Sequence, residues 1–238
     1  MQFKDSVKNK KITISSEVVY LLGILLLSFS VAMIASTNFG VSMIVAPAYI
    51  ISQKLEFITF GQSEYIIQGL LFIAFCILMK RFKPIYLFSF ITGLIYGAVL
   101  DLWRLIIPHF NPALCPPGSQ PMPLRIIYFA VGMLLTSLAV SLFFRTYIYP
   151  QVYDFFVKCV SEKYGIDRTE FKTAFDGSML IISCVLSLVL FHGFVGIGVG
   201  TIIMTVLNGT IIGLFGRLID KFVITKPAVK RLAKIFEV

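Results

Sequence analysis

The chain has 238 residues, of which 58% are hydrophobic and only 14% are charged, and its mean hydropathy is +0.89. Soluble domains carry about 25% charged residues, so this composition excludes an ordinary water-soluble protein and indicates a polytopic membrane protein. The net charge of +9 does not indicate a nucleic-acid-binding protein. Its Lys and Arg residues lie at the ends of apolar runs, as the cytoplasmic anchors of membrane helices do.

The first half of the sequence predicts three membrane-spanning helices and one short apolar segment. The three spans are expected over residues 18–35, 66–79 and 85–107. The short segment, residues 41–51, is interrupted by Pro47. A helix of this length covers roughly 16 Å, about half of the hydrocarbon thickness. We expect it to be either a re-entrant half-helix or a tilted helix buried in protein.

The second half shows the same order of segments after a proline-rich connector, residues 108–124. Residues 126–144 form an apolar run, and residues 145–163 occupy the place of the short segment but are more polar. Residues 177–216 contain no Asp, Glu, Lys or Arg and are long enough for two helices with a break near His192.

The two halves align as an internal repeat, with repeat one at about 18–107 and repeat two at about 125–219 in a single membrane domain. Many secondary transporters consist of two repeats with the substrate site between them near the midplane of the membrane. Three pairs of residues occur in the same order, at offsets of 109, 108 and 112 residues: Gly23 and Gly132, Gln68 and Asp176, and Gly97 and Gly209.

Two topologies are open. If the short segments do not cross the membrane, the chain has six full spans in inverted repeats, and 18 of its 21 Lys and Arg residues lie inside. If both cross, eight spans form parallel repeats and 17 lie inside. The charge rule does not separate these topologies. We favour six full spans and two short or re-entrant segments, because Asp154 would be costly in lipid.

Both topologies place both termini in the cytoplasm. The basic tail, residues 220–238, is expected either to lie on anionic lipid as an amphipathic helix or to be a short solvated segment.

The last predicted helix carries small and polar residues that would let another helix or a ligand approach its backbone. The predicted points of approach are Gly200, Gly209 and, in the other repeat, Gly97. Thr201, Asn208 and Tyr96 are predicted to line a polar cavity between the repeats. The alternative is that these hydroxyl and amide groups only hold helices together.

Acidic residues near apolar runs are the candidate ion or substrate ligands. Asp101 follows an uncharged run, so it either has a function or pairs with Arg104 and anchors the helix end. Asp176 and its counterpart Gln68 begin equivalent helices, where a carboxylate either suits the helix dipole or faces the interface between repeats. Asp154 lies among aromatic residues that either help it bind a cation or form an interfacial belt.

Several of these features resemble a known family. The run Gly196-Ile-Gly-Val-Gly200-Thr201, the Asn208-Gly209 pair and the sequence Leu-Asp101-Leu-Trp103 resemble the YczE/YyaS/YitT type of bacterial integral membrane protein over about residues 15–220. YitT-type members often carry a soluble C-terminal domain, so this chain is more similar to the short YczE-like form. The resemblance implies a helical bundle in the bacterial inner membrane and no established substrate.

The sequence contains no nucleophile–base pair, zinc motif or phosphate-binding loop, so we expect no enzyme, no catalytic residue, no cofactor and no metal. We expect a transporter or permease for a small solute, coupled to protons or cations, with Asp101, Asp154 and Asp176 as candidate carriers. The alternatives are a scaffold or accessory protein, a substrate-binding subunit, or a lipid translocase. The expected partners are membrane lipids and a small-molecule or ion substrate, with no nucleic acid; a homodimer is left open.

Overall fold

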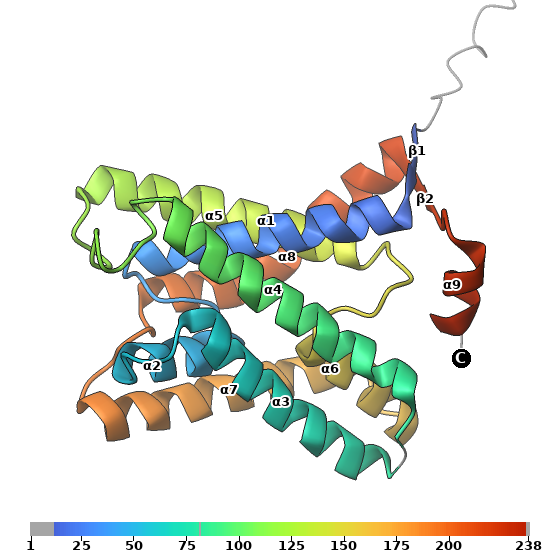
Figure 1. Ribbon diagram of the computed structural model, residues 1–238, viewed down its shortest axis with the longest axis horizontal. Coiled ribbons are helices and arrows are strands. Elements are labelled where there is room, and N and C mark those ends of the chain that lie inside the picture. Colours follow the sequence, from blue (N-terminus) through green and yellow to red (C-terminus); the bar gives the residue numbers. More distant parts are fainter. Residues whose placement is uncertain (1–11, 81, 237–238) are drawn as a thin grey trace, which may run out of the picture.

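The computed structural model describes residues 12–80 and 82–236, and within them the fold is helical apart from two short strands (Figure 1). The basic anchors predicted at Lys4, Lys8, Lys10, Lys11 and Arg81 lie outside the described residues.

Eight helices of the described residues form the body of the protein. They are α1 (Ser16–Ser36), α2 (Ala46–Lys54), α3 (Phe60–Met79), α4 (Leu87–Ile106), α5 (Met122–Phe143), α6 (Val152–Tyr164), α7 (Arg168–Phe191) and α8 (Val199–Phe222). A 3-10 turn (Pro84–Tyr86) leads into α4, and strand β1 (Ile12–Ser15) precedes α1. Strand β2 (Val223–Lys226) and helix α9 (Lys230–Phe236) follow α8.

Six helices of the described chain are long and apolar enough to cross a membrane, namely α1, α3, α4 with its preceding turn, α5, α7 and α8. The other two in the body are shorter, with nine residues in α2 and 13 in α6. The structure therefore confirms the prediction of an all-helical polytopic membrane protein with six long helices and two short ones.

Two of the long helices begin earlier than predicted. Helix α3 starts at Phe60 because Thr59 and Gln62 form a capping box that satisfies free backbone N–H groups. Helix α7 starts at Arg168 because the Asp167 carboxylate accepts hydrogen bonds from two backbone N–H groups of the first turn. Both starts lie in polar sequence, where hydrophobic periodicity carries no signal.

The short helix α6 reaches only part of the way along the bundle. The side chain of Gln151, at its N-terminal end, contacts Gln68 near the middle of α3. At its other end Lys163 donates to the carbonyl of Leu78, next to the last residue of α3. Helix α6 therefore covers about half of α3, as a re-entrant half-helix would.

The segment containing α2 also begins and ends near one end of the bundle. The N–H of Val41, before α2, donates to the carbonyl of Gly196 in the α7–α8 loop. Lys54, the last residue of α2, donates to the carbonyl of Leu190 at the end of α7. Neither short helix is among the six of the described chain that are long and apolar enough to cross a membrane, so helix length favours the six-span topology.

The helices pack in two groups, with α4 crossing between them (Figure 1). Helix α1 packs along α5, α1 contacts α4, and α5 contacts α8. In the other group α3 contacts α6, and α2 contacts α7. Helix α3 also packs along α4, whereas α7 and α8 do not pack along each other within the described residues.

Both ends of the described chain are held together. Strands β1 and β2 pair in parallel, with Ile12 opposite Val223. The Glu17 carboxylate then accepts hydrogen bonds from the backbone N–H groups of Ala228 and Val229, just before α9. Glu17 also accepts a hydrogen bond from the Tyr147 hydroxyl at 2.7 Å.

The tail packs against the protein instead of lying free. Phe236 is buried, and its ring lies 5.0 Å from those of both Phe88 and Tyr149. Burial and the hydrogen bond to Glu17 raise the pKa of Tyr147 to about 12, so its hydroxyl remains a donor at physiological pH. Part of the tail thus forms helix α9, whose Phe236 packs on the protein, so the short solvated segment is not found. Contact of the tail with anionic lipid stays a prediction.

Candidate functional site

Buried polar side chains gather where α3 of the first half meets α6 of the second. Glu64 and Gln68 are fully buried, one turn apart on the same face of α3. The side-chain amide of Gln68 donates to Glu64 Oε2 at 3.1 Å, and the hydroxyl of Tyr153 on α6 donates to the same oxygen at 2.9 Å. Gln68 Nε2 also lies 3.3 Å from Gln151 Oε1. One hydrogen-bonded network thus joins the two halves of the chain.

This network has more polar groups than hydrogen bonds. Among the described residues, Glu64 Oε1, Gln68 Oε1 and Gln151 Nε2 are buried without a hydrogen-bond partner. The hydroxyl of Tyr96 on α4 is likewise buried and without one. A buried polar group left unpaired costs about 1–3 kcal/mol, and more if it is charged. Several such groups in one apolar bundle therefore call for a functional explanation.

No positive charge compensates Glu64 in the part of the chain that the structure describes. None of the ion pairs there involves this residue. An isolated carboxylate buried in protein is costly, so such a group takes up a proton or a cation. The arrangement is chemically suited to reversible binding of either.

Helix α4 leaves room for this network through its glycines. A Cβ atom on Gly93 would collide with the side-chain oxygen of Gln68. One turn later, a Cβ on Gly97 would lie 2.8 Å from the carbonyl oxygen of Gly61 and would collide with the ring of Tyr65. Gly97 is therefore a point of close backbone approach, between α4 and α3.

Asp101 holds the start of α3 instead of pairing with Arg104. Its carboxylate accepts hydrogen bonds from the Thr59 hydroxyl at 2.5 Å and from the Gly61 N–H at 2.9 Å. The Arg104 guanidinium lies 5.4 Å from the centre of the Phe60 ring. Within the described residues these two side chains form no ion pair, so the alternative in which Asp101 pairs with Arg104 is not found. The cause is tertiary, because α3 brings an open N-terminus to Asp101.

The other two predicted acids come together around a lysine. The Lys172 ammonium lies 3.3 Å from a carboxylate oxygen of Asp154 on α6 and 3.0 Å from one of Asp176 on α7. All three side chains are partly exposed. At the predicted repeat offset of 108 residues, Lys172 aligns with Glu64 and Asp176 with Gln68. The second half therefore carries a compensated cluster where the first half carries an uncompensated carboxyl group.

Thr201 and Gly200 attach the start of α8 to the loop after α1. The Thr201 hydroxyl donates to the carbonyl of Val41 at 2.8 Å, and the Gly200 N–H donates to the carbonyl of Phe39 at 2.8 Å. A Cβ on Gly200 would lie only 2.9 Å from that same oxygen of Phe39. Both residues therefore hold one segment of backbone against another.

Asn208 connects α8 to α5, because its side-chain oxygen accepts a hydrogen bond from the Ser137 hydroxyl at 2.6 Å. Neither Asn208 nor Thr201 bonds to Tyr96, so the structure does not bring the three together as the lining of one polar site. Gly209 has no neighbouring atom within 4 Å of an added Cβ, so no backbone approaches it here.

The sequence pattern does not single out Glu64, Gln151, Tyr153 or Lys172 as site residues. Glu64 had a usable signal, since it lies four residues before Gln68 and so shares its helix face. Gln151 and Tyr153 had none, because only the packing of α6 on α3 shows what they face.

The candidate site falls within a range that matches a known family model. Residues 14–217 match the model of a family of unknown function (DUF6198), which covers the helical body from β1 into α8. No curated protein and no solved structure matches the chain. The chain, whose described part has six helices long and apolar enough to cross a membrane, thus belongs to the family of unknown function DUF6198.

Proposed function

We propose that the protein is a secondary transporter or permease for a small solute, coupled to protons or another cation. The observation that carries the proposal is Glu64, a fully buried carboxyl group at the contact between the two halves, with one oxygen unpartnered. An ionisable residue inside a membrane bundle is costly and is usually retained for ion or substrate movement.

Binding and release at Glu64 would be reversible because its neighbours suit both charge states. The Tyr153 hydroxyl and the Gln68 amide donate to the carboxylate. A protonated Glu64 can itself donate, and Gln68 Oε1 is a buried acceptor nearby without a partner. In this proposal Glu64, Gln68, Tyr96, Gln151 and Tyr153 form the site. Asp101, Thr201 and Asn208 position helices around it.

The proposal includes an inverted internal repeat. Its support is that α1 to α4 and α5 to α8 have the same order of long and short helices, and that α3–α6 and α2–α7 are equivalent contacts under exchange of the halves. Inverted repeats place the substrate between them near the midplane. The resemblance to the YczE/YyaS/YitT type, the bacterial inner membrane and the cytoplasmic location of both termini belong to the same proposal.

The test uses purified protein in proteoliposomes on a solid-supported membrane. A panel of amino acids, small amines and inorganic cations is applied by rapid exchange, with and without a pH gradient, and charge movement is recorded. We expect at least one solute to produce a current. The Glu64→Gln variant should abolish its coupling to the ion, because glutamine keeps the shape and hydrogen bonds but cannot titrate. Glu56→Gln, an exposed residue of the α2–α3 loop, is the matched control.

Two outcomes would contradict the proposal. A current with unchanged ion dependence in Glu64→Gln would remove Glu64 from the coupling site. The absence of any charge movement or solute uptake in the unaltered protein would favour a scaffold or a substrate-binding subunit instead. Size-exclusion profiles of both variants check that folding is retained.

A further inference from the structure

One side of α8 is open along its length. A Cβ atom on Gly209 or on Gly213 would meet no atom within 4 Å, and α7 does not pack along α8 within the described chain. In the first half the corresponding glycine, Gly97, is in contact with α3. The second half therefore presents a glycine-lined helix face without a helix to cover it.

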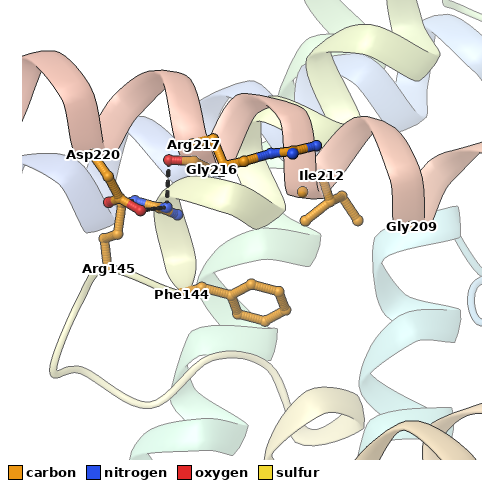
Figure 2. A pocket seen from close by; sticks show the side chains of 8 residues that line it. Phe144, Arg145, Gly209, Ile212, Gly216, Arg217 and Asp220 are labelled. Carbon is orange, nitrogen blue, oxygen red and sulfur yellow. Dashed lines mark hydrogen bonds and ion pairs between the residues drawn. The ribbon is translucent and has the colours of Figure 1, made fainter.

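A cavity of about 620 Å³ lies on this side of α8 (Figure 2). Its apolar part is formed by Gly209 and Gly213, with Phe144 and Ile212 as walls. Both α8 and α5 belong to the six helices long and apolar enough to cross a membrane. Because of this position, the natural occupant of the apolar part is hydrocarbon from the surrounding bilayer, and a glycine floor lets a flexible acyl chain lie against the backbone.

The other part of the cavity is charged. The Arg145 guanidinium is fully engaged, with Nε and Nη2 donating to the two carboxylate oxygens of Asp220 at 2.7 and 2.6 Å and Nη2 also donating to the Gly216 carbonyl at 2.6 Å. The Arg217 side chain makes no hydrogen bond or ion pair with any described residue. Figure 2 shows it extended along α8, with its guanidinium near Ile212.

The charges of the cavity match those of a lipid headgroup. Two arginines and one aspartate line it, and Asp220 neutralises Arg145, so the positive charge of Arg217 is available. A guanidinium binds phosphate through two parallel hydrogen bonds, which makes Arg a preferred ligand for phosphodiesters. Basic residues at the ends of membrane helices attract anionic lipids in the same way.

We propose that this cavity, formed by α5 and α8, binds one anionic glycerophospholipid. The phosphate pairs with Arg217, and an acyl chain lies along Gly209 and Gly213. The lipid would thus cover the glycine face of α8, whereas in the first half helix α3 covers the glycine face of α4. The proposal does not depend on transport activity, because it rests on the shape and charge of this face alone.

Native mass spectrometry of the full chain tests this lipid binding. The protein is incubated separately with phosphatidylglycerol and with phosphatidylcholine of the same acyl chains. We expect one phosphatidylglycerol to remain bound through detergent removal and no phosphatidylcholine to do so. Arg217→Gln should reduce phosphatidylglycerol retention to the phosphatidylcholine level. Lys221→Gln removes the same charge from an exposed residue that does not line the cavity, and should retain the lipid.

Gly213→Leu tests binding of the acyl chain separately from the effect of the Arg217 charge. Since an added Cβ meets no atom there, this variant should fold, fill the apolar part and lose the bound lipid. Equal losses in Arg217→Gln and Lys221→Gln would indicate non-specific attraction to a basic surface and overturn the proposal. Unchanged retention in Gly213→Leu, or equal retention of the two lipids by the unaltered protein, would also overturn it.

Discussion

The helix pair α3–α4 is closed, whereas the pair α7–α8 at the corresponding place in the second half is open. In α3–α4, Gly61 and Gly97 lie against each other, and Asp101 binds the start of α3. In α7–α8, Gly209 aligns with Gly97, and Gly213 takes the place of Asp101. Small residues therefore permit close approach but do not impose it.

The loops contribute to this difference. A short turn with one 3-10 segment joins α3 to α4, so the two helices leave it side by side. The α7–α8 loop is instead tied to the segment after α1, through the hydrogen bonds of Gly196 with Val41 and of Gly200 with Phe39. Helix α8 starts from that attachment and packs on α5.

The largest effect is expected from adding a methyl group at the closed pair. Gly61→Ala places a Cβ atom in collision with the Gly97 carbonyl, which is backbone and cannot move aside as a side chain can. Overpacking of this kind costs about 1–3 kcal/mol. Gly213→Ala, at the open pair, should be neutral or stabilising by up to about 1 kcal/mol, because alanine favours helix.

Unfolding of both variants in one detergent measures this contrast. Equal stability of Gly61→Ala and Gly213→Ala would contradict this difference between the two pairs, since it would mean that α3 and α4 are not in close contact at Gly61.

A smaller effect is expected from removing the carboxylate that binds the start of α3. Asp101→Ala deletes the acceptor for the Thr59 hydroxyl and the Gly61 N–H. Loss of a helix N-terminal acceptor costs about 0.5–2 kcal/mol. The same unfolding experiment measures it, and solute uptake by the folded fraction should persist. Loss of uptake without loss of stability would instead indicate that Asp101 takes part in transport.

The smallest effect is expected where α8 attaches to α5. Asn208→Ala removes the hydrogen bond from Ser137, and such bonds between membrane helices contribute about 0.6 kcal/mol on average. Ser137 keeps its bond to the Met133 carbonyl, so no buried donor is left unpaired. A loss of unfolding free energy as large as that of Gly61→Ala would contradict the open arrangement. It would show that α8 is held against α5 as tightly as α4 is held against α3.

Several features of the candidate site follow from the sequence, and others do not. Gln68 and Tyr96 were predicted as site residues, and both lie buried in or beside the polar network. The sequence predicts Asp154 and Asp176 as candidate carriers but does not predict that Lys172 bridges them. The role of Asp101 at the start of α3 depends on a partner forty positions earlier, so no local pattern predicts it.

The amino-acid sequence alone is enough to predict the class of protein, the six long apolar helices of the described chain and the two short segments. The length of an apolar run is a local property, and it must match the thickness of the bilayer. The folded arrangement is needed to show that Glu64 is uncompensated, that the tail docks through Phe236 and that α8 leaves a face open. The free-energy cost of burying a polar group depends on the groups that contact it, and these come from distant parts of the chain.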